Sequence, residues 1–345
     1  MEHYNKMKIV SLSIFLLIST LLLLSGCGGG GGMSGANSQT STTTLSDWST
    51  TTNPSTVTAS GLGYESTQTY DERNNIYVRN DNIVDANNFY LPTVSLTYDA
   101  SGNITGATLN TGTPTLNASS LSATESVQFY SSTDGTSATY LGLTNPRVLN
   151  WKYHSLVSWI HKDGTNLRSG ASSVGNRTPD MSVPTTGTGT FSGKSVGFFS
   201  PSDGYNESGG TPLIPITPST YYVEGDVTIT ADFANRRLNV QQPNDVTMTD
   251  IFTGENINST ALKIGMRLQA TSTNPNVFNS TLAGTSGVTT KVGATVRVSN
   301  EYQLSGTAKA ELYGTHASEV GGVFHFIKNV GSKGGSYQGA FGAKR

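Results

Sequence analysis

Residues 221–233 read YYVEGDVTITADF, and apolar and polar side chains alternate along this stretch. Val227 and Ile229 fall on one side of an extended chain, whereas Asp226 and Thr228 fall on the other. Strict alternation of this kind is typical of a β-strand with one buried face and one face in water. The stretch therefore predicts an antiparallel strand, and it sets the fold class of the chain as all-β.

Similar strand patterns recur through the second half of the chain. Three stretches share the period of two, and four more are short apolar runs of strand length. These stretches are residues 262–270, 288–298 and 302–312, together with 151–160, 188–199, 321–327 and 336–344. Small residues such as Gly193, Gly306 and Ala308 recur at their inward positions, which suits a tightly curved wall. With about eight strands, residues 148–345 are predicted to form an eight-stranded antiparallel β-barrel.

The first half of the folded chain predicts a smaller sheet domain over residues 45–147. Its expected strands are Ile76–Asn80, Asn88–Asp99, Asn103–Asn110 and Glu125–Ser132. We expect the boundary near Asn145 and Pro146, because polar turn residues there separate two apolar runs.

Overall composition argues against a nucleic-acid partner and against a disulfide within the chain. Net charge is −2 and charged residues make up 13% of the chain, without a dense Lys/Arg stripe, so nucleic acid is not an expected partner. The single cysteine, Cys27, rules out a disulfide within one chain.

The first 27 residues have the layout of an export signal. Lys6 and Lys8 precede an almost wholly apolar run over residues 9–24, which is short for a membrane-spanning helix. The run is followed by Leu24-Ser25-Gly26-Cys27, which resembles the bacterial lipobox. That resemblance implies cleavage after residue 26 and lipidation of Cys27; an ordinary signal peptide with a chance cysteine is the alternative. Two or three acyl chains give a stable anchor.

Residues 27–44 consist mostly of Gly, Ser and Thr, and they predict a flexible tether between lipid and body. In enteric bacteria an Asp at position 28 would favour retention in the inner membrane. The Gly28 found here therefore suggests sorting to the outer membrane.

Several motifs of the second half resemble the transferrin-binding protein B family of surface lipoproteins. They agree in order and spacing across nearly the whole predicted barrel. The matching residues are Pro184, Gly187, Phe191 and Gly193, then Asp232-Phe233 with Arg236-Arg237, then Tyr313, Gly314, Ala317, Glu319, Gly321, Gly322 and Phe324, and finally Phe341 to Lys344.

The resemblance implies a handle domain followed by an eight-stranded barrel, displayed on the outer face of a Gram-negative bacterium. Relatives bind haem or a host protein such as transferrin, lactoferrin or haemoglobin, and many depend on an outer-membrane receptor or export partner. The family's namesake has two lobes of handle plus barrel, whereas this sequence holds one. We expect the motif residues themselves to serve the fold.

Catalytic patterns are missing from the sequence, so we name no catalytic, cofactor-binding or metal residues and expect no enzyme. The run GTFSGKS, residues 189–195, is preceded by Thr188 at the position where a phosphate-binding loop needs glycine. His154 and His161 flank aromatic residues and could bind haem as a ligand, but surface or strand-end histidines are the favoured interpretation. Asp245 and Asp250 lack a full calcium-loop pattern, which favours a solvated loop.

An aromatic and Pro-rich loop is the better candidate for function, because binding residues sit on loops held by a rigid scaffold. The alternative is a loop packed across the barrel mouth. The candidate partner-binding residues are Phe199, Tyr205, Leu213, Ile214, Ile216 and Tyr221.

Together these features predict a lipid-anchored binding protein of the outer membrane that faces the cell exterior. It would capture haem, or an iron- or haem-carrying protein, through barrel and handle loops. The alternative is a periplasm-facing structural or envelope-assembly lipoprotein that uses the same barrel.

Overall fold

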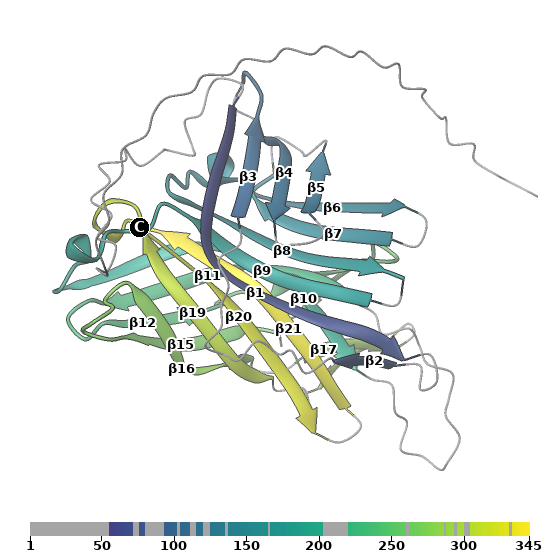
Figure 1. Cartoon of the computed structure of the whole chain (residues 1–345). Coiled ribbons are helices and arrows are strands. Elements are labelled where there is room, and N and C mark those ends of the chain that lie inside the picture. Colours follow the sequence, from purple (N-terminus) through teal and green to yellow (C-terminus); the bar gives the residue numbers. More distant parts are fainter. Residues whose placement is uncertain are drawn as a thin grey trace, which may run out of the picture. The chain divides into compact units, whose positions relative to one another are not determined.

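Two antiparallel β-sheets hold nearly all the strands of this chain in the computed structural model (Figure 1). The structure describes residues 55–71, 76–79, 93–101, 104–110, 115–119, 125–134, 137–164, 166–202, 220–259, 262–285, 288–292, 295–299, 304–330 and 333–345. The chain divides into two units, Met1–Thr43 and Thr44–Arg345, and both sheets belong to the second unit. The predicted signal, the tether and Cys27 lie outside the described residues. No helix among the described residues has the length and apolar character needed to cross a membrane.

The first sheet has nine strands, and we call it the N-terminal sheet. Its strands run in the order β5-β4-β3-β1-β9-β8-β7-β6, with β2 also paired to β1. Their bounds are β1 (Ser55–Asp71), β2 (Ile76–Arg79), β3 (Thr93–Tyr98), β4 (Ile104–Asn110), β5 (Thr115–Ser119), β6 (Val127–Asp134), β7 (Ser137–Thr144), β8 (His154–Asp163) and β9 (Asn166–Gly175). A short helix, α1 (Pro146–Leu149), follows β7, and the Asn145 side chain caps its start.

Strand β1 bends the N-terminal sheet because it changes partner along its 17 residues. Residues 55–60 pair with β3, and residues 61–69 pair with β9. Gly61 stands at the change of partner, where a Cβ would overlap the carbonyl oxygen of Ser173. Only glycine lets the two backbones approach so closely, so this residue permits the bend.

Strands β7 to β9 are buried on both faces. Val157 and Trp159 on β8 pack with the β3–β4 hairpin, in a cluster that includes Leu96. Leu156 and Ile160 on the same strand pack with residues of the second sheet. This double burial explains one wrong prediction, which placed residues 151–160 in the barrel: the stretch is apolar on both sides, but β8 pairs with β7 and β9.

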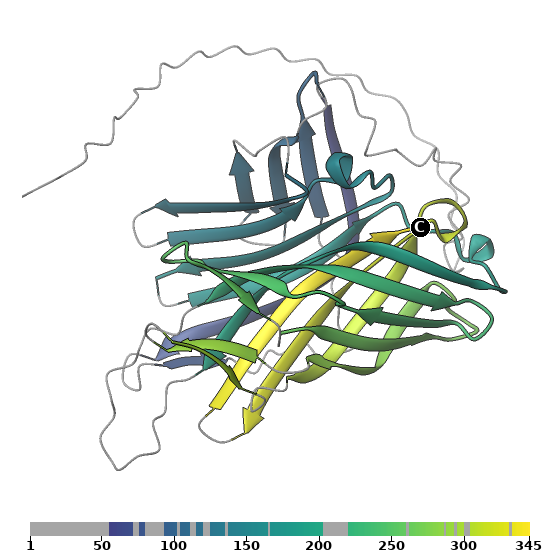
Figure 2. The same cartoon turned by 180° about the vertical axis from the view of Figure 1, so that it is seen from behind.

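The second sheet closes on itself as an eight-stranded antiparallel barrel, which confirms the predicted fold (Figures 1 and 2). The ring order is β10-β21-β20-β19-β16-β15-β12-β11, and twelve residue pairs between β10 and β11 close it. The bounds are β10 (Thr188–Ser202), β11 (Tyr221–Asp232), β12 (Arg237–Gln241), β15 (Ile264–Ala270), β16 (Val277–Thr285), β19 (Ser305–Tyr313), β20 (Glu319–Val330) and β21 (Lys333–Lys344). Strands β13 (Val246–Asp250) and β14 (Asn256–Ser259) extend the wall beside β11.

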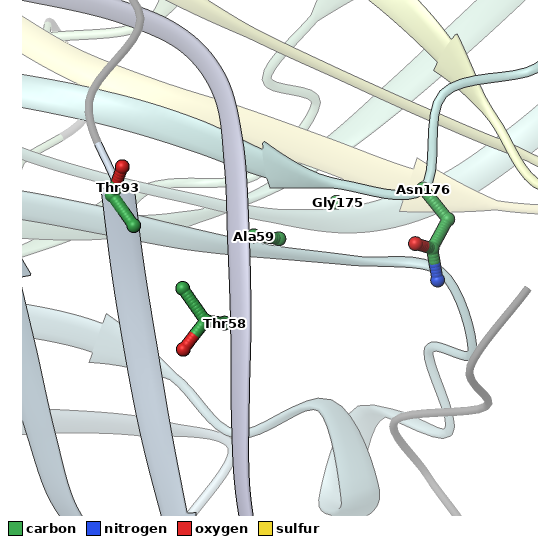
Figure 3. A pocket seen from close by; sticks show the side chains of 5 residues that line it. All are labelled: Thr58, Ala59, Thr93, Gly175 and Asn176. Carbon is green, nitrogen blue, oxygen red and sulfur yellow. The ribbon is translucent and has the colours of Figure 1, made fainter. Parts of the chain in front are cut away.

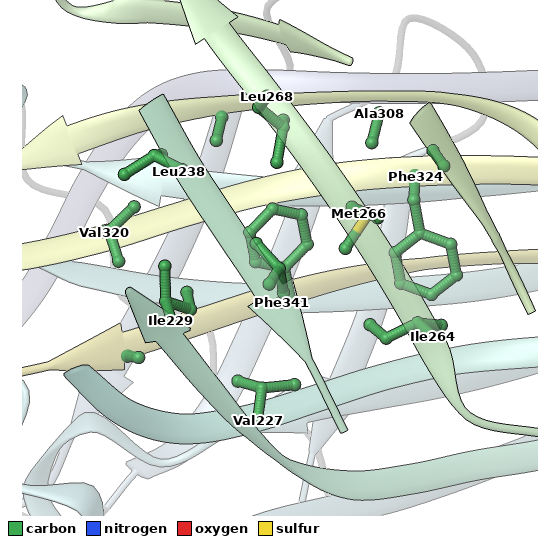
Figure 4. Close-up of a cluster of buried hydrophobic side chains, with 14 of the residues drawn as sticks. Val227, Ile229, Leu238, Ile264, Met266, Leu268, Ala308, Val320, Phe324 and Phe341 are labelled. Carbon is green, nitrogen blue, oxygen red and sulfur yellow. The ribbon is translucent and has the colours of Figure 1, made fainter. Parts of the chain in front are cut away.

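The barrel interior is the largest apolar core of the described residues (Figure 4). The opening stretch behaves as its alternation predicts: Val227, Ile229 and Ala231 on β11 point into the core, next to Leu238 and Phe341. Each fully buried aliphatic or aromatic side chain of this kind contributes roughly 1.5–3 kcal/mol. Closure is therefore stabilised by strands from the start and the end of the barrel segment.

Two of the barrel strands differ from the prediction. Residues 288–298 alternate cleanly, yet they form a separate hairpin of β17 (Val288–Val292) and β18 (Thr295–Ser299). Two other strands occupy the barrel positions that were predicted for residues 151–160 and 288–298. They are β12, which has five residues, and β16, whose pairing register shifts twice. Short length and register shifts both weaken a period-two signal. The chain passes from the N-terminal sheet to the barrel between β9 and β10, and a 3-10 turn, η1 (Asp180–Ser182), lies in this connection. The predicted domain bounds, residues 45–147 and 148–345, stay predictions.

Candidate functional site

The six loop residues predicted to contact a partner divide into two groups. Tyr205, Leu213, Ile214 and Ile216 lie outside the described residues. Phe199 and Tyr221 lie on β10 and β11, are buried in the barrel core, and stack with ring centroids 6.3 Å apart. These two rings therefore support the base of the loop from within the barrel, and contact by the other four stays a prediction.

A group of four aromatic rings, two exposed and two buried, lies beside this loop base, and we call it the aromatic patch: Phe129, Tyr140, Tyr222 and Phe252. Phe129 is 37% exposed and Phe252 is 62% exposed, although both are large apolar side chains. Ring centroids are 5.0 Å apart for Phe129 and Tyr222 and 6.0 Å apart for Tyr140 and Phe252. The patch thus joins strands of the N-terminal sheet to the barrel wall.

A tight turn after β13 presents Phe252 to solvent. The Asp250 Oδ1 atom accepts hydrogen bonds from the backbone N–H groups of Phe252 and Thr253, at 2.8 and 3.0 Å. Gly254 has a φ of 73° and donates its N–H to the Asp250 carbonyl oxygen at 2.8 Å. An Asx turn of this kind fixes the backbone locally, so Phe252 is held outward at little entropic cost. Asp250 therefore shapes a turn from a buried position at the end of β13, which differs from the solvated loop expected for it.

Tyr222 forms the floor of the aromatic patch and is held rigidly. Its ring lies against Gly142 on β7, where a Cβ would overlap it, and its centroid is 5.7 Å from that of Phe198. Burial, reinforced by the nearby Glu224 carboxylate, raises the pKa of the Tyr222 phenol well above its usual value. Tyr222 thus gives a neutral, rigid surface beneath the exposed Phe129 ring, and Tyr140 does the same beside Phe252, an arrangement typical of interface anchors.

Glu319 links the N-terminal sheet to the barrel through three hydrogen bonds. Its Oε1 atom accepts the backbone N–H of Lys152 at 2.6 Å, and its Oε2 atom accepts that of Tyr153 at 3.0 Å. The Oε2 atom also lies 2.7 Å from His154 Nδ1, and both side chains are buried. Because Glu319 belongs to the motif that runs from Tyr313 to Phe324, this contact explains that motif as part of the junction between the sheets.

Glycines of the same motif make room for the junction. Gly314 has a φ of 76° and a Cβ there would overlap the Tyr153 ring, while Gly321 faces Ser173 and His154. Tyr313 donates its hydroxyl hydrogen to the Ser173 carbonyl oxygen at 3.0 Å. The expectation that the motif residues serve the fold is consistent with every one of these contacts.

The four histidines of the described residues are dispersed. His154 is stacked between Trp151 and Tyr313, with centroid distances of 4.2 and 5.2 Å, and no surface of its ring is exposed. His161 lies seven residues further along β8, roughly 23 Å away by strand rise, and its Nδ1 atom contacts the Thr139 hydroxyl at 2.9 Å. His325 stacks on Tyr64 at 4.3 Å, and His316 lies in a turn with a φ of 55°.

Sites for chemistry are scarce within the described ranges. No group of three or more His, Cys, Asp or Glu side chains could hold a metal ion there. A shallow pocket is lined by Thr58, Ala59, Thr93, Gly175 and Asn176, none of which titrates (Figure 3). Asp245 forms an ion pair with Lys263 at 3.2 Å, far from a calcium-loop arrangement.

Comparison with known protein families finds a match over the barrel residues. Residues 183–345 match the family described as the C-lobe and N-lobe beta barrels of Tf-binding protein B. A search of the curated proteins finds no match.

Three solved structures of bacterial binding proteins are similar to this chain at low sequence identity. A transferrin-binding protein B mutant from Haemophilus parasuis is 17% identical with a TM-score of 0.40, over 81% of this chain and 45% of that one. The Neisseria meningitidis protein is 15% identical with a TM-score of 0.40, over 82% and 43%. HpuA from Kingella denitrificans, solved in complex with human haemoglobin, is 12% identical with a TM-score of 0.35, over 87% and 90%. This chain thus spans less than half the length of the first two.

Phe129, Tyr140 and Phe252 were not among the residues singled out from the sequence. Phe252 stands in DIFTGE, where Asp and Gly four residues apart predict a turn, so an aromatic residue in that turn was a usable signal. Phe129 and Tyr140 gave no such signal, because their approach to Phe252 depends on how β6 and β7 lie against the barrel.

Proposed function

Residues 183–345 of this chain belong to the Tf-binding protein B barrel family, and from that premise we propose that the protein is a lipid-anchored surface protein that captures haem or an iron- or haem-carrying protein. Barrels of this family serve binding, and the chain is not an enzyme. The partner is proposed to meet the loops of the barrel and of the N-terminal sheet domain. An outer-membrane receptor and an export partner belong to the same proposal.

The aromatic patch is the observation that carries this function. Exposed rings on a rigid, apolar floor supply most of the binding energy in protein interfaces, because they bury large areas at low entropic cost. Phe129 and Phe252 meet this description, one from each sheet. Contact of the partner with Tyr205, Leu213, Ile214 and Ile216 remains part of the proposal. A surface of this kind fits a folded protein partner better than a free small molecule.

Alanine substitutions at Phe129 and Phe252 test the function. Binding of immobilised human transferrin, lactoferrin, haemoglobin and free haem is measured by biolayer interferometry with the full chain in detergent micelles. We expect one of these to bind, and we expect each substitution to weaken it about 10-fold or more. Met181→Ala is the matched control, because Met181 is 96% exposed in η1, outside the patch. Wild-type protein that binds none of the four ligands would rule the proposal out.

Anchoring through Cys27 is the second part of the proposal. Thioether lipidation needs the sulfur atom, so Cys27→Ser removes the point of attachment while leaving the folded body unchanged. We expect the variant to leave the membrane pellet at high salt. Protease shaving of intact cells then distinguishes the outer face from the periplasmic one: wild-type protein that resists shaving until the outer membrane is opened faces the periplasm, as in the structural-lipoprotein alternative.

A further inference from the structure

Strand β6 is an open edge of the N-terminal sheet. Among the described strands it pairs with β7 alone, through eight residue pairs from Val127–Thr144 to Asp134–Ser137. The other side of β6 therefore carries backbone N–H and C=O groups that no strand of the described chain satisfies.

The residues that face outward can be assigned from one hydrogen bond. The Asn145 N–H donates to the Ser126 carbonyl oxygen at 2.9 Å, directly next to the first residue pair of β6 and β7. Because hydrogen-bonded and non-hydrogen-bonded pairs alternate in an antiparallel ladder, the even-numbered residues of β6 bond to β7. The N–H and C=O groups of the odd-numbered residues, Phe129, Ser131 and Thr133 among them, then point away from the sheet.

Within the described part of the chain, this edge lacks the protection that natural edge strands usually carry. Lysine, proline, a bulge or a covering segment normally prevents pairing with another chain. The sequence of β6 is VQFYSSTD, without a basic residue or a proline. Its register with β7 continues without a shift, and Ser131 and Thr133 are exposed. The edge is thus long, regular and accessible.

The chemistry beside the edge selects a partner. The exposed ring of Phe129 belongs to the aromatic patch, so an added strand would lie against apolar surface. Glu125 and Glu255 are exposed, two residues before β6 and three residues after Phe252 in the chain. Burial raises the pKa of the half-buried Glu224 on β11, and the nearby Asp226 and Glu125 carboxylates add to this rise, which places Glu125 near Glu224. The nearby Lys194 ammonium is already paired with Asp226 at 2.8 Å.

We propose that an extended, basic segment of the captured protein adds to β6 as a further strand of the N-terminal sheet. Main-chain hydrogen bonds to the odd-numbered residues hold the segment, an apolar side chain packs on Phe129 and Phe252, and a Lys or Arg side chain meets Glu125. Strand addition of this kind takes affinity from the backbone and specificity from alternate side chains. The inference rests on the proposed function, since it names the part of the partner that the aromatic patch recognises.

Proline substitutions on the open side test the edge directly. Ser131→Pro and Thr133→Pro each remove an outward N–H and keep the hydrogen bonds to β7, as edge strands tolerate. Ser131→Ala is the matched control because it keeps the N–H. With the full chain in detergent micelles, we expect both proline variants to bind the iron- or haem-carrying protein at least 10-fold more weakly, with an unchanged melting temperature, and the alanine variant to bind normally. Proline variants that fold and bind like wild type overturn the inference.

A peptide probe decides the question where the proline variants fail to fold or where no iron protein binds. The probe is the synthetic peptide KVTVTVK, with EVTVTVE as the control of reversed charge, and the measurement is amide hydrogen exchange of the wild-type chain. Slower exchange of the Phe129, Ser131 and Thr133 amides with the basic peptide alone supports the inference, even if the proposed function fails. Equal exchange with and without the basic peptide overturns it.

Self-association is the competing use of the edge. Two copies could pair β6 with β6 about a twofold axis. Sedimentation of wild type and of Ser131→Pro separates the two uses. A wild-type dimer that the proline converts to a monomer, with binding of the iron protein unaffected, overturns the inference; a wild-type monomer agrees with it.

Discussion

Removing the Glu319 carboxylate should destabilise the junction between the N-terminal sheet and the barrel more than most single changes. Glu319 is 3% exposed, and its two oxygens accept the N–H groups of Lys152 and Tyr153 and contact His154 Nδ1. Glu319→Ala leaves these groups without a partner in the interior, and each buried unsatisfied group costs about 1–3 kcal/mol. With partial relaxation we expect a loss of about 3–5 kcal/mol in the free energy of unfolding, as for other broken buried pairs.

The loss can be measured by urea unfolding and by thermal melting. Trp151, one of three tryptophans in the chain, stacks on His154 at 4.2 Å, so part of the tryptophan fluorescence reports on the junction. For one cooperative unit spanning Thr44–Arg345, the expected change is a fall in melting temperature of about 5–8 °C. Glu319→Gln keeps one acceptor oxygen and should fall in between, while Glu255→Ala, at an exposed site, is the control. A Glu319→Ala loss below about 1 kcal/mol would refute the reasoning.

Two further predictions concern packing and charge in the barrel wall. Gly342→Ala should cost about 1–3 kcal/mol, because a Cβ at this position overlaps His154 Nε2, whereas Gly265→Ala, with no atom within 4 Å, should be neutral; equal melting temperatures for the two variants would contradict this. Burial raises the pKa of Glu311, so its contribution to stability is present below the unfolded pKa and is lost as pH rises through the folded pKa. Glu311→Gln should therefore be more stable than wild type at pH 7 and match it near pH 3, as measured by urea unfolding; a gain that persists at pH 3 would point to another cause.

The sequence predicts the barrel strands best where one face is buried and the other is wet. The alternation along residues 221–233 predicts β11 correctly, because its inward side chains meet a closed core and its outward ones meet solvent. The same rule fails for β8, whose Leu156 and Trp159 sit in different cores on opposite faces of one strand. A strand buried on both sides shows apolar residues without a period, so its sheet cannot be deduced from its own residues.

The candidate site could be predicted only in part for a related reason. Aromatic residues near a Pro-rich loop drew attention to one end of β10 and β11, but Phe199 and Tyr221 themselves are buried in the core. The exposed rings of Phe129 and Phe252 come from segments more than 100 residues apart, joined by pairing and packing across two sheets. Local sequence patterns carry no information on contacts between segments so far apart in the chain.

The order of strands around the barrel also has a kinetic consequence. Strand β10 pairs with β11, its neighbour in the chain, and with β21, whose partner for Ser192 is Lys344. The ring therefore stays open until the last strand is available, and Val323 and Ala340, which cover one face of β8, cannot be in place earlier. Because loop closure over such separations is slow, we expect one apolar face of the N-terminal sheet to stay uncovered during the early stages of folding. A chain kept unfolded until β21 is available would avoid that exposure. The final strand therefore sets the time at which folding can be completed.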